Sequence, residues 1–170
     1  MKGTSPLLAL VVLIAVVVVV AWAATAILTG DGLWFVPVFS AEAKSIELYW
    51  DGGHVMLEAG SAGYELLDAA VRQDFAHVKG YPGQVGLSDA TLERLYAEGR
   101  LLIVRYAEPA RIHSWYNFAP SRTYYVPLSG HHAAQSRLFN ASRGALELRS
   151  IANIMAAAEA VARQEGLAQP

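Results

Sequence analysis

The sequence predicts the α+β class, with one N-terminal transmembrane helix followed by a small domain that has a mainly antiparallel sheet and about three helices. Two observations predict this class. An uncharged apolar run extends from Pro6 to Leu28, which is long enough to cross a bilayer as one helix. Farther along the chain, the predicted strands come in runs and do not alternate regularly with helices, which favours antiparallel pairing. We therefore divide the chain into a transmembrane anchor (1–29), a juxtamembrane linker (30–43) and an extracytoplasmic domain (44–170).

The overall composition excludes several classes of protein. The chain of 170 residues contains no cysteine, which excludes disulfides, thiolate metal sites and a cysteine nucleophile. Its formal net charge of -2 provides no basic surplus, so we expect no nucleic-acid partner. No motif in the sequence implies a cofactor or a metal. The glycine-rich stretch 80–86, for example, lacks the Lys-Ser/Thr pair of a phosphate-binding loop.

The apolar run has the flanking charges of an uncleaved anchor. Lys2 and the amino terminus precede the run, and Asp31 is the first charge after it. Because positive residues remain on the cytoplasmic side, we expect a single-pass protein of the cell membrane with its N-terminus in the cytoplasm and its domain outside. Two small-x-small triplets, 21–23 and 24–26, fit a cleaved signal peptide instead. The run is longer than the usual ~7–15 apolar residues of a signal peptide, which favours retention.

Residues 2–8, Lys-Gly-Thr-Ser-Pro-Leu-Leu, lie directly before the long apolar run. With these residues the N-terminus resembles the leader region of archaeal type IV pilins. The resemblance implies that a peptidase cuts after Gly3 and that the apolar helix then packs in a filament core. It covers only the leader and the apolar run, because the C-terminal region lacks the pattern of the all-β head expected in that family.

The linker is rich in aromatic residues, whereas flexible stalks are poor in them. Gly30 and Gly32 end the preceding helix, and Pro37 keeps the next stretch extended. The linker either lies in the lipid headgroup layer as an aromatic belt or forms a first strand that packs on the domain. For the first alternative, the predicted membrane-interface residues are Trp22, Trp34, Phe35 and Phe39.

The first half of the domain predicts a hairpin and two helices. Asp51-Gly52-Gly53 supplies the positive φ angles of a tight turn between two strands. Ser61 and Ser88 are predicted helix N-caps. Glu47 and Glu58 are expected on the solvated face of the hairpin. The predicted elements are strands at 44–50 and 54–59, helices at 62–78 and 89–98, and a loop at 79–86.

The second half of the domain predicts a run of strands and a last helix. Residues 101–104 are continuously apolar, which indicates a central strand, and Pro109 is expected to end it. Ser150 is the predicted cap of the last helix. All helices are expected to pack on one face of the sheet. The predicted elements are strands at 101–108, 111–118, 122–128, 137–140 and 145–148, a polar loop at 129–135, and a helix at 151–164.

Aromatic residues are concentrated in the predicted strands 111–118 and 122–128. Aromatic and arginine side chains are enriched at interaction hot spots. Because alternate residues of a strand face opposite sides, some of these side chains belong to the core and others to a surface. Core packing is therefore the alternative to a binding role for each of them. The predicted binding surface comprises Trp115, Tyr116, Tyr124, Tyr125, Arg111 and Arg122.

Histidines are the candidates for catalysis, although no catalytic or metal-binding residue is assigned. His113 precedes a serine, but the chain lacks the Gly-x-Ser-x-Gly turn of many hydrolases. His131 and His132 lie in a glycine-flanked loop, but their spacing fits no zinc motif. We therefore expect a single-pass membrane-anchored extracytoplasmic binding or accessory module, with the membrane and a protein of a membrane or envelope complex as partners. The alternatives are a small envelope hydrolase that uses His113 or the His131/His132 loop, and a pilin-like filament subunit.

Overall fold

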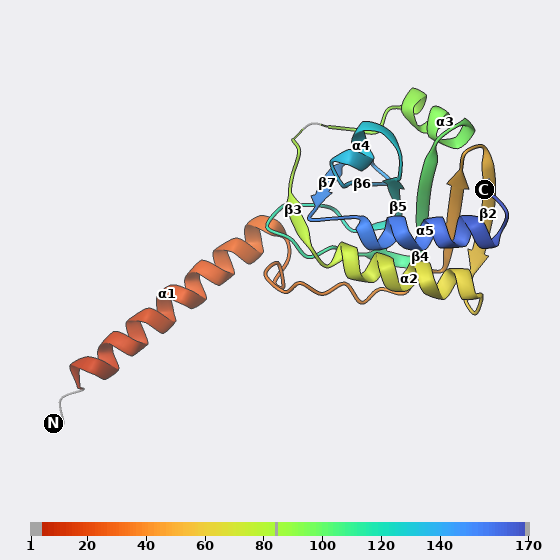
Figure 1. Cartoon of the computed structure of the whole chain (residues 1–170). Coiled ribbons are helices and arrows are strands. Elements are labelled where there is room, and N and C mark those ends of the chain that lie inside the picture. Colours follow the sequence, from red (N-terminus) through yellow and green to blue (C-terminus); the bar gives the residue numbers. More distant parts are fainter. Residues whose placement is uncertain (1–4, 84, 169–170) are drawn as a thin grey trace.

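The computed structural model describes residues 5–83 and 85–168. Within these residues, helix α1 (Pro6–Thr29) projects away from a domain built on a seven-stranded antiparallel sheet (Figure 1). This arrangement confirms the predicted class of one N-terminal apolar helix followed by an α+β domain. The other elements are β1 (Ser45–Trp50), β2 (Gly53–Glu58), α2 (Ala62–Phe75), β3 (Val78–Gly80), α3 (Asp89–Ala97), β4 (Arg100–Ala110), β5 (Ser121–Pro127), α4 (Gly130–Ala134), β6 (Arg137–Asn140), β7 (Ala145–Leu148) and α5 (Ala152–Gln164).

Helix α1 has 24 residues and is apolar on all sides. The side chain of Ser5 caps its first turn by accepting a hydrogen bond from the main-chain N–H of Leu8, and Gly30 ends it in the left-handed conformation with φ 66°. By length and composition the helix can cross a membrane. Lys2, Gly3 and Thr4, on which the predicted orientation and the leader resemblance depend, lie outside the described residues.

The strands of the described residues follow the order β2-β1-β4-β5-β6-β7-β3. The β1–β2 hairpin confirms the prediction from its turn residues: Trp50 pairs with Gly53, and Asp51 and Gly52 both have positive φ. Strand β3 was not predicted. It consists of Val78, which was expected to end the helix 62–78, and of the first two residues of the expected loop 79–86; helix α2 ends earlier, at Phe75. Strand β3 pairs with β7 at the edge of the sheet.

Helices α2 and α5 lie side by side and cover one face of the sheet (Figure 1). Ile46, Leu48 and Trp50 of β1 point into this layer, as their alternation predicts. Tyr64 and Phe75 of α2 are fully buried against them. This layer contains most of the hydrophobic core.

The expectation that all helices pack on one face is wrong. Helix α3 covers the opposite face through Leu95, which packs with Leu101 and Ile103 of β4 and with Phe139 of β6. The reason is the continuous apolar run of β4, which places buried side chains on both faces of the sheet. Each face then needs a covering layer to exclude water.

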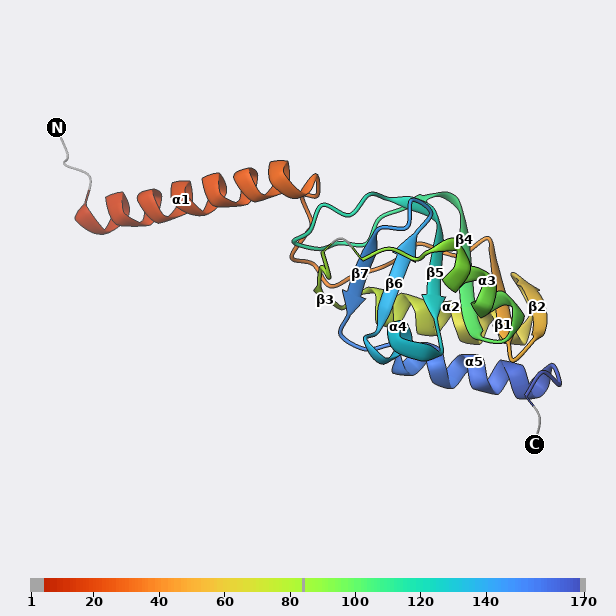
Figure 2. The ribbon, with the colours of Figure 1, turned by 90° about the horizontal axis from the view of Figure 1, so that it is seen from above.

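Two further predictions in the second half are corrected by the pairing of β4 with β5. Strand β4 continues through Pro109, and Ala110 pairs directly with Ser121. The segment 111–120 is therefore a long loop and not a strand, because its neighbours already pair with each other. The expected loop 129–135 contains the short helix α4. Figure 2 shows the 111–120 loop and β3 at the end of the domain nearest to α1.

Candidate functional site

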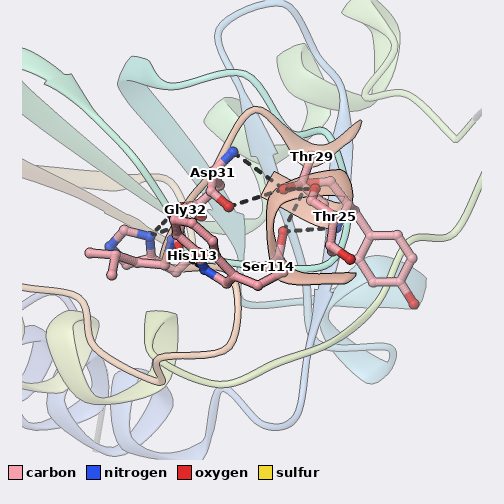
Figure 3. Close-up of polar contacts among 9 residues, drawn as sticks. Thr25, Thr29, Asp31, Gly32, His113 and Ser114 are labelled. Atoms are coloured by element: carbon pink, nitrogen blue, oxygen red, sulfur yellow. Dashed lines mark hydrogen bonds and ion pairs between the residues drawn. The ribbon is translucent and has the colours of Figure 1, made fainter. Parts of the chain in front are cut away.

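The end of α1 is held by a compact set of hydrogen bonds (Figure 3). The hydroxyl of Thr29 donates to the carbonyl of Thr25 at 2.9 Å and accepts from the N–H of Asp31 at 3.2 Å. The carboxylate of Asp31 accepts from the N–H of Leu33 at 2.9 Å. Asp31 is only 6% exposed. These contacts order the chain where it leaves the helix.

Asp31 also joins the linker to the 111–120 loop. The Nδ1 atom of His113 lies 2.9 Å and 3.1 Å from the two carboxylate oxygens of Asp31. Ser114 closes the loop beside it, because its hydroxyl donates to the carbonyl of Tyr116 and accepts from the N–H of the same residue. A carboxylate on Nδ1 orients the imidazole and leaves Nε2 directed away from the pair.

Aromatic rings extend the same contact between the linker and the loop. The rings of Trp34 and Trp115 are 3.8 Å apart between centroids, and Phe35 packs edge-on against Trp34 at 5.2 Å. The indole N–H of Trp22, in the last turns of α1, donates to the carbonyl of Gly32 at 3.0 Å. The linker therefore packs on the domain.

A pocket of about 310 Å³ lies at this junction, which we call the junction pocket. It is lined by linker residues 34–37, by residues 76–79 at the start of β3, by loop residues 113–116 and by Arg149. Within the described part of the chain, its lining includes His77, Lys79, His113 and Arg149 but no carboxylate. Two of these side chains are paired with acidic groups that are not part of the lining: His113 contacts Asp31, and the ammonium of Lys79 lies 2.5 Å from Glu147.

The predicted aromatic binding surface is divided by the structure. Tyr124 is fully buried in the core, where its hydroxyl donates to the carbonyl of Ala110 at 2.7 Å, and burial raises its pKa to about 12. Tyr125, the next residue of β5, faces the opposite layer beside Tyr96. Trp115, at 61% exposed, and Tyr116 lie on the loop at the junction. Adjacent strand residues cannot share a face, so the four aromatic residues form no common surface.

The two arginines of that surface do not join the aromatic residues in one site either. Arg122 is exposed and forms an ion pair of 3.0 Å with Glu108 on the neighbouring strand. Arg111 is half-buried at the start of the loop. Neither lines the junction pocket. The part of the predicted surface that does line it consists of Trp115 and Tyr116.

The predicted membrane-interface residues are also separated. Phe39 is buried in the core, where it packs edge-on against Phe75 and Tyr106. It packs on the domain, as the second alternative expects, but the linker residues 30–43 form no strand. Trp22, in the last turns of α1, and Phe35 of the linker are both exposed.

His131 and His132 lie on α4 and do not line the junction pocket. They line a second pocket of about 450 Å³ with residues of α3. Burial, followed by the positive charge of Arg137, lowers the pKa of His132, which packs edge-on against Phe139. Across residues 5–83 and 85–168, no group of three or more His, Asp or Glu side chains is placed to hold a metal ion.

Glu47 of the hairpin lies in a different environment from the one that its position in the strand predicts. Glu47 is only 6% exposed, although it was expected on the solvated face. Its carboxylate accepts hydrogen bonds from Nε of Arg105 at 2.6 Å and from the hydroxyl of Tyr49 at 3.3 Å. The reason is that β1 lies inside the sheet, so long side chains of the same face cover its middle residue.

No protein-family model, curated protein or solved structure matches the chain. The geometry of the molecule itself is therefore the basis for inferring its function. The junction pocket is the site that it favours, because a buried acid, an oriented histidine, exposed aromatic rings and basic side chains meet there.

Proposed function

We propose that the protein is a single-pass membrane-anchored binding or accessory module, whose domain lies outside the cytoplasm and is held against the bilayer surface. In this arrangement α1 is the anchor and the junction pocket faces the headgroup layer. The module serves as a subunit or partner of a membrane or envelope complex.

The observation that carries this proposal is the packed junction between α1 and the domain. The Asp31–His113 pair and the contact of Trp34 with Trp115 fasten the linker to the loop 111–120. A domain that only needed tethering would be served by a flexible linker. A packed junction instead gives the domain a defined height and orientation relative to the anchor.

Exposed apolar side chains next to α1 support the same orientation. Leu33, Phe35 and Val38 of the linker are each about half exposed, and Trp115 is more exposed still. Large apolar and aromatic side chains of this kind are stabilised in the interfacial layer of a bilayer. The opposite end of the domain, where α5 ends, carries charged residues such as Arg163.

Nitroxide labels test the proposed height of the domain. Because the chain has no cysteine, Phe35→Cys and the control Glu165→Cys each provide a single labelling site. In liposomes, we expect the label at position 35 to be accessible to oxygen and protected from a water-soluble nickel reagent, and the label at 165 to show the reverse. Equal access of the nickel reagent to both labels would contradict the proposal.

The side of the membrane and the partner need two further measurements. A membrane-impermeant maleimide is expected to label Glu165→Cys in intact cells; labelling only after lysis would place the domain in the cytoplasm. A photoreactive residue at position 115 is expected to crosslink a defined membrane protein in the native host, whereas one at Gln73 on α2 is not. Identical crosslinks from both positions would argue against a partner at the junction.

A second candidate function is hydrolysis, which the Asp31–His113 pair favours. A histidine held by a carboxylate at Nδ1 and lining a pocket has the arrangement of a general base. The hydroxyl of Ser114 donates its hydrogen to the carbonyl of Tyr116 and is not directed to His113, so the base would activate water. Turnover of simple esters by the full chain, lost in His113→Ala and retained in His131→Ala, would support this function. Absence of turnover, or turnover indifferent to both changes, would refute it.

A further inference from the structure

If α1 spans the membrane, as the function proposed above requires, the junction pocket lies at the depth of the lipid phosphates. The 24 residues of α1 rise about 36 Å as a helix, compared with ~30 Å for the hydrocarbon core. The end of the helix therefore reaches the headgroup layer. The pocket begins only a few residues later, at Trp34. Figure 2 shows β3 and the 111–120 loop beside the end of α1.

The side chains of the pocket are suited to a phosphate group. Its described lining combines Arg149 and Lys79 with the imidazoles of His77 and His113, and it contains no carboxylate. Lys79 and His113 are already held by acidic partners. Arg149 is exposed and takes part in no ion pair of residues 5–83 and 85–168. A guanidinium offers two parallel N–H donors to the oxygens of one phosphate.

We propose that the junction pocket binds the phosphodiester headgroup of an anionic phospholipid, with Arg149 as its principal contact. Lys79 and the imidazole of His77 supply further donors around it. The main-chain N–H of Arg149 donates to the carbonyl of His77 at 2.8 Å, so the backbone of both residues is set by the β3–β7 edge.

The aromatic rim favours a lipid over a free phosphate ion. Trp34, Phe35, Trp115 and Tyr116 border the basic residues. A glycerol backbone and the upper acyl chains would pack on such rings, whereas an inorganic phosphate gains nothing from them. The lipid also reaches the site by diffusion in the membrane, where its effective concentration is high.

Lipid titration of the full chain tests this inference. The protein in neutral detergent micelles is titrated with short-chain phosphatidylglycerol or phosphatidylcholine, and bound lipids are counted by native mass spectrometry. We expect selective binding of one phosphatidylglycerol. In Arg149→Gln its affinity is expected to fall roughly tenfold, which is the scale of one charge-assisted contact. The control Arg163→Gln, an exposed arginine at the far end of α5, is expected to bind as the unaltered protein does.

Three outcomes would overturn the inference. They are equal binding of the two lipids, equal phosphatidylglycerol binding by both variants, and displacement of the lipid by inorganic phosphate at matched concentration. The last outcome would identify a site for the free ion. The nitroxide measurement at position 35 is independent of these results. If the label at position 35 lies in the headgroup layer but the protein shows no selectivity between the two lipids, only the phosphate site is refuted. If the label lies in water, the proposed function itself is refuted.

Discussion

Removal of the Asp31 carboxylate is the most direct test of the packed junction. In Asp31→Ala, the N–H of Leu33 and Nδ1 of His113 both lose their acceptor. A net hydrogen bond contributes about 1 kcal/mol, and one to a charged group about 2 kcal/mol. Because Asp31 is buried, water does not replace these contacts in the closed state. We therefore expect the free energy of opening the linker to fall by about 3 kcal/mol.

Amide hydrogen exchange of residues 30–38 measures this opening. A change of about 3 kcal/mol corresponds to roughly 150-fold faster exchange, since ~1.4 kcal/mol is a factor of ten. The control is Asp51→Ala, which removes an exposed carboxylate from Arg100 at the other end of the domain and is expected to leave the linker unchanged. An increase below about tenfold in Asp31→Ala would refute the reasoning.

A double-mutant cycle then separates the Asp31–His113 contact from the other contacts of each residue. Asp31→Ala and His113→Ala, alone and together, are expected to show a coupling energy of about 1–2 kcal/mol in the opening of the linker. The exposed pair of Glu108 and Arg122 is expected to couple by less than about 0.5 kcal/mol, because solvent screens it. Strictly additive effects for the first pair would mean that the two residues act separately.

Four further predictions concern three buried or partly buried side chains and the N-terminal helix. Tyr124→Phe is expected to cost about 1–2 kcal/mol of unfolding free energy, measured by urea denaturation, because a buried carbonyl loses its donor. Phe39→Ala is expected to cost about 3 kcal/mol, whereas Phe35→Ala leaves unfolding nearly unchanged and reduces only contact with membranes. The pKa of His132 is below that of an unfolded histidine, so the unfolded state binds more protons; stability should therefore fall as the pH drops through about 6.5, and less so in His132→Gln. Mass spectrometry of the purified protein is expected to show α1 retained, and a mature chain that begins after residue 23 or 26, at the small-x-small triplets, would contradict the anchor.

Local chemistry explains why several elements were predictable. The β1–β2 turn depends on Asp51 and Gly52, whose neighbours in the sequence are their neighbours in space. Ser61 and Ser88 cap their helices by accepting from an N–H three residues later. The apolar character of α1 is a property of composition alone. Such features need no knowledge of the rest of the fold.

Pairing partners explain the elements that were not predictable. The loop 111–120 has the aromatic composition of a strand, but the direct pairing of Ala110 with Ser121 leaves it no place in the ladder. Strand β3 exists only because β7 offers an edge to it. Likewise, the second layer formed by α3 follows from the burial of both faces of β4.

The candidate site likewise combines residues that the sequence singles out with residues that only the fold brings together. His113 was a candidate from its residue type, and Trp115, Tyr116, Trp34 and Phe35 were candidates from their aromatic character. Their meeting at one pocket was not predicted, nor were the contributions of His77, Lys79 and Arg149. No local pattern distinguishes these basic residues, because their common feature is position around the β3–β7 edge.

The sequence by itself determined the long apolar helix, the tight hairpin and the α+β class, because each depends on composition or on residues close together in the chain. Only the tertiary structure decided which aromatic residues are buried and which surround the junction. It also decided that Asp31, 82 residues before His113, is the partner of that histidine. Contacts over such separations depend on how the whole sheet pairs, and the order of the amino acids near either residue does not encode that pairing.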